Sequence, residues 1–126
     1  MNGGAAVIEL LRALKPLLRN HGDLQVCVQH PSLGVEGLTF VELRSEHAEM
    51  VDLYSGTTDE VFTVARLSKA LHGMAVRGAD EYELYVFHPA HGAEPLVEIT
   101  TGNDCVLLLT EYSDERSRVS ARRSRQ

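Results

Sequence analysis

An internal repeat sets narrow limits on the architecture of this 126-residue chain. Residues 24–55 align without gaps with residues 82–113, at an offset of 58, and eight of the 32 positions are identical. A His-Pro dipeptide, a glycine three residues beyond the proline and a closing Tyr-Ser recur in step in both segments. Two unrelated antiparallel meanders with coincidental turn residues are the alternative. The shared spacing favours a duplication.

The first repeat begins with a predicted helix. Apolar residues between positions 7 and 18 recur at three- and four-residue spacing, as the buried stripe of one helix requires. Pro16 lacks a backbone donor, so we expect it to end this helix near Lys15 or to kink it. Gly22 follows at a place where a left-handed C-cap is expected.

The second repeat begins in the same way. Apolar residues between positions 64 and 75 form the stripe of a second helix. Thr63 is a suitable N-cap, because its hydroxyl can accept a hydrogen bond from an orphan amide of the first turn. Gly78 follows as the expected C-cap.

Three strands are predicted after each helix. The first strand of each repeat alternates apolar and polar residues, which is typical of a half-buried strand. The His-Pro-x-x-Gly stretch that follows is a predicted turn, since proline presets φ and glycine permits positive φ. The predicted strands are 24–29 and 82–86, 38–43 and 96–101, and 48–54 and 105–111.

These elements predict the α+β class, with two αβββ repeats related by a pseudo-twofold axis. Strands joined by short turns pair antiparallel. We therefore expect about six antiparallel strands, in one sheet or two facing sheets, with two helices on one face. Residues 1–113 would form a single domain of two repeats, about 5–55 and 63–113, and residues 114–126 a flexible Arg-rich tail.

Charge is distributed unevenly along the chain. Residues 1–113 hold seven Lys or Arg against sixteen Asp or Glu, a net charge of −9, whereas residues 114–126 have a net charge of +3. An acidic body disfavours phosphate backbones, because like charges repel. No apolar run approaches the roughly 20 residues of a membrane span, and the N-terminus lacks the basic region of a signal peptide. We therefore expect a cytoplasmic, soluble protein with no membrane partner.

Histidines and cysteines near the two equivalent turns are the candidates for a metal centre. His30, His88 and His91, with Cys27 or Cys105, are residue types that bind zinc. The repeat does not preserve His91, and neither Cys-x-x-Cys nor His-Glu-x-x-His spacing occurs. Turn residues and small packing residues are the favoured interpretation, so no metal site is predicted.

Motifs for covalent catalysis and cofactor binding are absent from the sequence. No Gly-x-Ser-x-Gly elbow, phosphate-binding loop or dinucleotide-binding pattern occurs. Cys27 lies out of phase with the apolar residues of its strand, and a free cysteine is more often a packing residue than a nucleophile. The prediction is a protein that is not an enzyme and has no cofactor. A small metal protein or enzyme at the three histidines is a further alternative.

Five acidic residues are the candidates for a binding surface. Glu36 and Glu94 are equivalent in the repeat and lie just after the turn glycine, where a solvated charge at a strand edge is expected. Asp80, Glu81 and Glu83 are interpreted as solvated charges that guard a strand against edge-to-edge pairing. Paired carboxylates for acid–base catalysis are the alternative interpretation of the two equivalent glutamates.

One local pattern resembles small, uncharacterised phage- and plasmid-borne helix–strand proteins. The matching residues are Thr63-Val64-Ala65-Arg66-Leu67 in the second repeat, and Leu10-Leu11 with His21-Gly22-Asp23-Leu24-Gln25-Val26 in the first. The resemblance covers about 20 residues per repeat and implies no active site. It implies a mobile-element origin, and with it a host-protein inhibitor of the anti-CRISPR kind. An acidic surface suits that role, because it can occupy a basic groove built for nucleic acid.

The leading hypothesis is a non-catalytic module that binds another protein, itself basic or nucleic-acid-binding, through the five acidic residues. The second is an accessory protein that binds nucleic acid through its C-terminal tail. A homodimer is also possible, because an exposed sheet edge invites one. The arginines of the tail are Arg116, Arg118, Arg122, Arg123 and Arg125.

Overall fold

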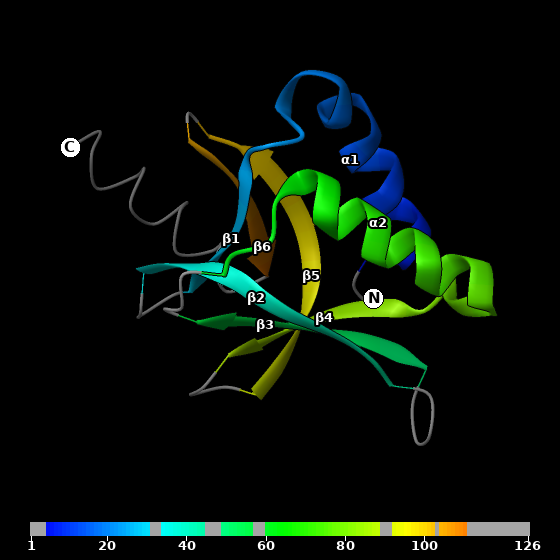
Figure 1. Ribbon diagram of the computed structural model, residues 1–126. Helices are drawn as coiled ribbons and strands as arrows, with labels where there is room; N and C mark the ends of the chain where they lie inside the picture. Colours follow the sequence, from blue (N-terminus) through cyan, green and yellow to red (C-terminus); the bar gives the residue numbers. More distant parts are fainter. Residues whose placement is uncertain are drawn as a thin grey trace.

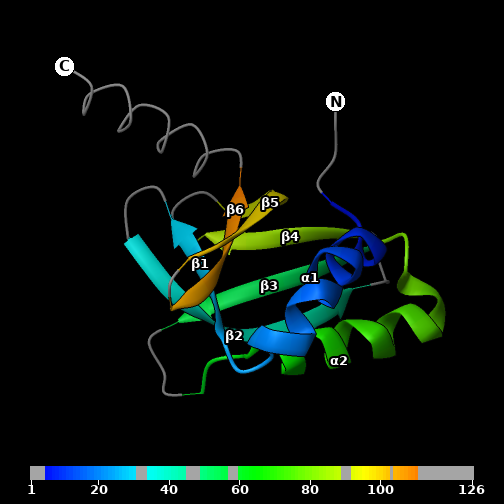
Figure 2. The same cartoon turned by 90° about the horizontal axis from the view of Figure 1, so that it is seen from above.

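Six strands close into a barrel, and two helices pack against it (Figures 1 and 2). The computed structural model describes residues 5–30, 34–44, 49–56, 60–88, 92–102 and 104–110, apart from the side chains of residues 30 and 88. In chain order the elements are α1 (Val7–His21), β1 (Gln25–His30), β2 (Gly34–Arg44), β3 (Met50–Gly56), α2 (Val64–Met74), a π-helical turn η1 (Ala75–Ala79), β4 (Glu83–His88), β5 (Gly92–Thr101) and β6 (Cys105–Thr110).

The barrel combines antiparallel and parallel pairing. Within each half of the chain the three strands pair antiparallel, as expected. The halves meet at two parallel seams, β1 with β6 and β3 with β4. The α+β class is confirmed, but the predicted arrangement, antiparallel strands alone in one sheet or two facing sheets, is wrong. Apolar alternation determines which side chains face the core, but it does not determine which strand edges pair. Closure pairs both outer edges of each half, so none of the six described strands is an edge strand.

One core fills the barrel and the space beneath the helices. Each helix contributes a stripe of buried side chains, and each strand contributes its inward-facing positions. The most deeply buried of these are Val7 and Leu14 of α1, Val64, Leu67 and Leu71 of α2, and Val26, Val28, Leu38, Val51, Leu53, Leu84, Val86, Val106 and Leu108 of the strands.

The segment before α2 completes the hairpin of the first half. The Phe62 backbone amide donates to the Leu38 carbonyl at 2.8 Å, and the Phe62 carbonyl accepts from the Val26 amide at 2.8 Å. Phe62 therefore lies between β1 and β2, at the end where these strands separate. The backbone groups there are satisfied by a segment from the other half of the chain.

The segment before α1 does the same for the second half. The Ala5 amide donates to the Leu96 carbonyl at 2.7 Å, and the Ala5 carbonyl accepts from the Leu84 amide at 2.9 Å. Ala5 thus lies between β4 and β5, as Phe62 lies between β1 and β2. Each half therefore contributes a short segment that hydrogen-bonds between two strands of the other half. We call these the lead-in segments, one at Ala5 and one at Phe62, and through them the two halves interlock. The common origin of the halves stays a prediction.

Helix α1 does not end at its proline, so that prediction is wrong. The helix continues through Pro16 to His21. Pro16 is exposed, so water can solvate the one carbonyl that it leaves without a donor. The expected left-handed C-cap is also wrong, because Gly22 has a φ of −60°. Its carbonyl accepts from the Ala65 amide at 3.0 Å, which ties the end of α1 to the start of α2.

Helix α2 follows the prediction more closely. The Thr63 hydroxyl accepts a hydrogen bond from the Arg66 amide at 3.2 Å, which confirms the N-cap. The helical path extends through η1, beyond the predicted stripe. Gly78 then has a φ of +101°, a conformation that side-chain-bearing residues rarely adopt, and it turns the chain toward β4.

Strand register corrects part of the repeat alignment. Leu38 pairs with Ser55 in the first half, and Leu96 pairs with Thr110 in the second. Across the described strands β3 and β6 therefore correspond at an offset of 55, whereas β1 and β4 correspond at 58. The stretch from Leu38 to Ser55 is three residues longer than the stretch from Leu96 to Thr110, so the ungapped alignment of the third strands is wrong. Strands β2 and β5 also begin four residues earlier than predicted.

Candidate functional site

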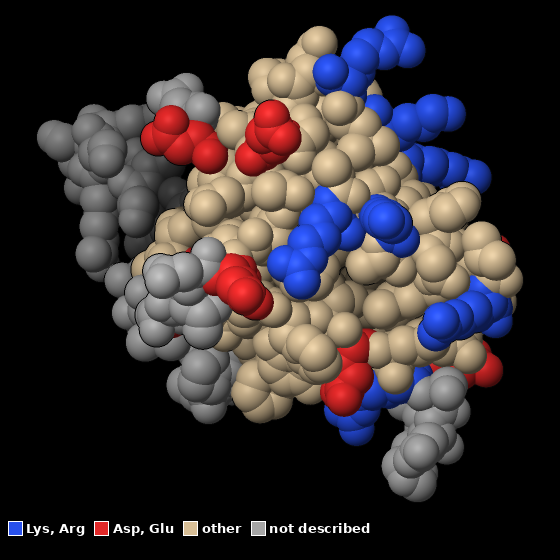
Figure 3. Space-filling model, in the orientation of Figure 1, with Lys and Arg blue, Asp and Glu red and all other residues tan. Residues whose placement is uncertain are grey.

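Positive and negative charges occupy different parts of the molecule. Among the described residues six of the seven basic side chains lie on α1, α2 and η1, and Figure 3 shows Lys and Arg gathered over the helices. Of the thirteen described carboxylates, six lie on strands, six in the connections between elements and one, Glu9, on a helix. The acidic character predicted for the whole body therefore belongs to the strands and their connections, and the helices are basic. The six helical cations are Arg12, Lys15, Arg19, Arg66, Lys69 and Arg77.

Two equivalent glutamates point into the barrel. Glu36 lies opposite Val28 and accepts a hydrogen bond from the Ser55 hydroxyl at 2.9 Å. Glu94 accepts one from the Thr110 hydroxyl at 3.0 Å. Glu94 is only 4% exposed, so the expectation of a solvated charge is wrong for it. Glu36 is half-buried.

Strand parity explains this burial and could have revealed it. Glu94 stands two residues before the buried Leu96, and Glu36 two residues before Leu38, so each glutamate faces the same side of its strand as a core leucine. One oxygen of Glu94, Oε2, has no hydrogen-bond partner within the described part of the chain. The two glutamates belong to the barrel interior and are poor candidates for a protein-contact surface.

The other three predicted acidic residues lie around the start of β4. Asp80 and Glu81 are exposed in the turn that precedes this strand. Glu83 pairs with Met50 on one side and bridges to Ala6 on the other, so β4 has no free edge there. The expected role of guarding an edge strand is therefore wrong. Binding of a partner by these residues stays a prediction.

A row of aromatic rings crosses the outside of the barrel. Phe40 on β2 packs against Tyr54 on β3 with ring centroids 5.7 Å apart, and Tyr54 packs against Phe87 on β4 at 5.4 Å. Phe40 is 53% exposed and Phe87 is 42% exposed. Tyr54 and Phe87 follow the buried Leu53 and Val86, and Phe40 precedes Val41, which packs against the core, so all three rings lie on the outer face. None of the three rings was predicted from the sequence to be part of a binding site.

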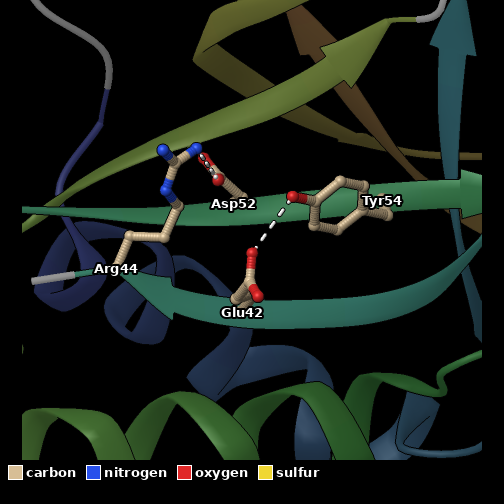
Figure 4. Close-up of polar contacts among 4 residues, drawn as sticks. All are labelled: Glu42, Arg44, Asp52 and Tyr54. Atoms are coloured by element: carbon tan, nitrogen blue, oxygen red, sulfur yellow. Dashed lines mark hydrogen bonds and ion pairs between the residues drawn. The ribbon is translucent and has the colours of Figure 1, made fainter. Parts of the chain in front are cut away.

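Charged groups adjoin these rings on the same strands (Figure 4). Arg44 Nη1 lies 3.0 Å from Asp52 Oδ2, and the Tyr54 hydroxyl donates to Glu42 Oε1 at 3.1 Å. The hydrogen bond to Asp52, and then its charge, raise the pKa of Arg44. Burial, and then the hydrogen bond to Glu42, raise the pKa of Tyr54. We call the set Phe40, Glu42, Asp52, Tyr54, Glu83 and Phe87 the outer face of β2–β4.

Two carboxylate oxygens on this face are buried without a hydrogen-bond partner among the described residues. They are Asp52 Oδ1 and Glu83 Oε2. Asp52 is only 2% exposed, although its strand neighbours Val51 and Leu53 are the residues that face the core. A buried carboxylate oxygen gains much from a donor, above all a charged one. The outer face thus combines buried acceptors that lack a described partner with exposed aromatic surface.

The groove beside α1 and the carboxylates as metal ligands are weaker candidates for a functional site. A groove of about 180 Å³ lies between α1 and β5, lined by Leu10, Ala13, Leu96 and Val97 among others. That volume is below the range of about 300–1,000 Å³ that is usual for small-molecule pockets. In the described part of the chain, no three His, Cys, Asp or Glu side chains gather closely enough to hold a metal ion.

Several predicted site residues lie outside the described residues. They are the side chains of His30 and His88, the whole of His91, and the arginines of residues 114–126. The metal and nucleic-acid alternatives that depend on them stay predictions. Within the described chain, neither helix has the length and apolar character needed to cross a membrane.

Comparison of the chain with protein-family models, with curated proteins and with solved structures gives no match.

Proposed function

We propose that this protein is a non-catalytic interaction module that binds a basic segment of another protein through the outer face of β2–β4. The observation that carries the proposal is the buried Asp52 carboxylate, which faces outward with one oxygen lacking a partner beside three packed rings. A fold gains nothing by burying such a group unsatisfied. A partner that supplies an Arg or Lys side chain would satisfy it.

The rings supply the apolar part of this interface. Aromatic residues are enriched at the centres of protein interfaces, because they bury large areas and lose little conformational entropy. Phe40 and Phe87 are held apart by Tyr54, so the three rings form one continuous strip. An arginine or lysine can lie over such rings while its charged end reaches a carboxylate.

The charge distribution supports a basic partner. The outer face carries Glu42, Asp52 and Glu83, with Arg44 as the single described cation on the strands. An acidic barrel attracts a basic protein and accelerates its association. In its sharpest form the proposal is a mobile-element protein that inhibits a host nucleic-acid-binding protein by occupying its basic groove, as the resemblance to small phage- and plasmid-borne proteins implies.

The test is capture of partners from a bacterial lysate by the immobilised full chain, with and without nuclease, followed by affinity measurement with the purified partner. We expect one stoichiometric protein that survives nuclease. Phe40→Ala with Phe87→Ala should weaken its binding roughly 30-fold or more, as loss of an interface hot spot does. Glu42→Lys should weaken it as well and reduce its salt dependence.

Matched variants distinguish this face from general surface effects. Glu98→Lys reverses an exposed charge on β5, and Val76→Ala truncates an apolar side chain on η1 that is 74% exposed. Both should leave the affinity unchanged. Asp80→Lys with Glu81→Lys tests the surface that the sequence indicated. A partner that responds to this last pair and ignores the aromatic variants would move the interface to the turn before β4.

The Arg-rich tail favours a second candidate, binding to nucleic acid. Five arginines within residues 116–125 can neutralise phosphates, and such binding weakens steeply with salt. Capture that disappears with nuclease, and with deletion of residues 116–126, would support this function in place of the first.

We further propose that the two halves arose by duplication of one αβββ unit. The lead-in hydrogen bonds of Ala5 and Phe62 support this, because each joins the same two strand positions of the opposite half. The equivalent hydrogen bonds of Glu36 with Ser55 and of Glu94 with Thr110 support it as well.

A further inference from the structure

Both cysteines of the chain lie at one seam of the barrel. In the parallel pairing of β1 with β6, Gln25 is opposite Cys105 and Cys27 is opposite Leu107. The cysteines are therefore diagonal neighbours on adjacent strands. Val26, Val28 and Val106 alternate with them and are fully buried in the core, so both thiols lie on the outer side of this seam.

The two thiols are free and close together. Cys27 is buried and Cys105 is half-buried. Burial, then the nearby Cys105 and a hydrogen bond with its thiol, raise the pKa of Cys27 to about 11. Cys27 is therefore a protonated, protected thiol at neutral pH, and Cys105 is the one that a reagent reaches first.

The other parallel seam, between β3 and β4, has no pair of cysteines. Where β3 pairs with β4, the positions that correspond to Cys105 and Cys27 hold Met50 and Tyr85. The barrel therefore has one seam with two adjacent thiols and one with none. The β1–β6 seam also joins the first strand of the chain to the last.

We propose that Cys27 and Cys105 are a redox modification site that forms an intramolecular disulfide on exposure to a peroxide. The Cys105 sulfur attacks the peroxide O–O bond, and a sulfenic acid and one water form. The Cys27 sulfur then attacks the Cys105 sulfur, the S–S bond forms, and the hydroxyl leaves with the Cys27 proton as a second water. Two thiols are oxidised by two electrons and one peroxide is reduced; a small-molecule thiol reverses the change.

The bond would lock the closure of the barrel. It would join strands that are separated by most of the chain, and so restrict the unfolded state strongly. We expect the oxidised protein to unfold at a temperature roughly 5–10 °C above that of the reduced protein.

The experiment uses the reduced full chain, treated with hydrogen peroxide in slight excess. Free thiols are counted, the intact mass is measured without reductant, and linked peptides are mapped. We expect both thiols to disappear together, the monomer to lose two hydrogen atoms, and one peptide pair to link Cys27 with Cys105. Sulfinic acid at Cys105 with Cys27 still free, or a dimer linked through Cys105, would overturn the proposal.

Single variants serve as controls, and circular dichroism confirms that they fold. In Cys27→Ser, Cys105 should proceed to the sulfinic acid or to intermolecular dimers, because its resolving thiol is gone. In Cys105→Ser, Cys27 should resist peroxide. Equal peroxide sensitivity of Cys27 with and without Cys105 would also overturn the proposal. The peptide map of the unmodified sequence decides the question even if a variant does not fold.

Discussion

Asp52 combines two properties that rarely occur together in a residue kept for stability alone. Its side chain is buried on the outer face, and one of its oxygens lacks a partner in the described chain. Its ion pair with Arg44 contributes little, because the arginine side chain is 52% exposed and solvent screens the attraction. The burial of the carboxylate is therefore poorly compensated within the chain.

Replacement of Asp52 by asparagine separates stability from binding. Asn has the same shape and carries no charge, and its amide can donate to Glu42, which lies opposite on β2. We expect Asp52→Asn to leave the free energy of unfolding unchanged or to raise it by up to about 1 kcal/mol, as measured by urea denaturation. The same variant should bind the captured partner more weakly. A loss of more than about 2 kcal/mol would instead make the carboxylate structural.

The raised pKa of Cys27 should make the free energy of unfolding depend on pH in the alkaline range. Its pKa is raised from 9.0 to about 11 in the folded protein, so between these values the folded chain holds a proton that the unfolded chain has lost. This contribution to stability is fully present below pH 9 and is lost as the pH rises through about 11. Urea denaturation at increasing pH should show a steeper decline for the original protein than for Cys27→Ala. Equal slopes would contradict the assigned burial.

Among the elements, the lead-in segment before α2 depends on a glycine. A Cβ atom at Gly37 would lie 2.5 Å from Val61 Cγ2 and 2.9 Å from Val61 Cγ1. We expect Gly37→Ala to push this segment away from β2 and to lower the free energy of unfolding by about 1–3 kcal/mol. Chemical denaturation measures the change.

Gly73 provides the matched control. It lies inside α2, is exposed, and a Cβ there would meet no atom within 4 Å. Gly73→Ala should raise the free energy of unfolding by about 0.5–1 kcal/mol, because alanine restricts the unfolded chain and favours helix. If both alanines had the same effect, the contact with Val61 would not be the cause.

The elements themselves were largely predictable from the sequence. Periodicity and the Thr63 cap predicted both helices, and apolar alternation predicted six strands. The C-terminal end of α1 was not predictable in this way. The expectation that proline ends a helix does not take into account that this helix end is exposed to water and hydrogen-bonded to α2. The burial of Glu94 could have been predicted, because it lies two residues before the buried Leu96 on β5. Its position just after the turn glycine favoured the prediction of a solvated charge instead.

The aromatic row was harder to find. Phe40 and Tyr54 come together because β2 contains a register shift between Leu38 and Phe40, and such an irregularity leaves no clear signal in one sequence. Phe87 joins them only because β3 and β4 pair in parallel across the two halves. The site therefore depends on long-range pairing that local patterns do not encode.

At the scale of the whole molecule, neither half should fold alone as a monomer. Residues 1–57 would lack the Phe62 segment, and residues 58–126 would lack the Ala5 segment. Each fragment would also expose two unpaired strand edges. We expect each purified fragment to be unfolded or dimeric, and an equimolar mixture to recover the spectrum of the full chain, as followed by NMR. A folded monomeric fragment would contradict the interlocking of the halves.

The lead-in segments also determine when the protein can fold during its synthesis. Ala5 is synthesised before both of its partners, Leu84 and Leu96, which lie 79 and 91 residues later in the chain. At about 5–20 residues per second, helix α1 waits roughly 4–16 s for these strands. During that interval its apolar stripe has no barrel to cover it. The nascent chain is therefore a natural client for a chaperone at the ribosome, and the barrel closes only after β6 has been synthesised.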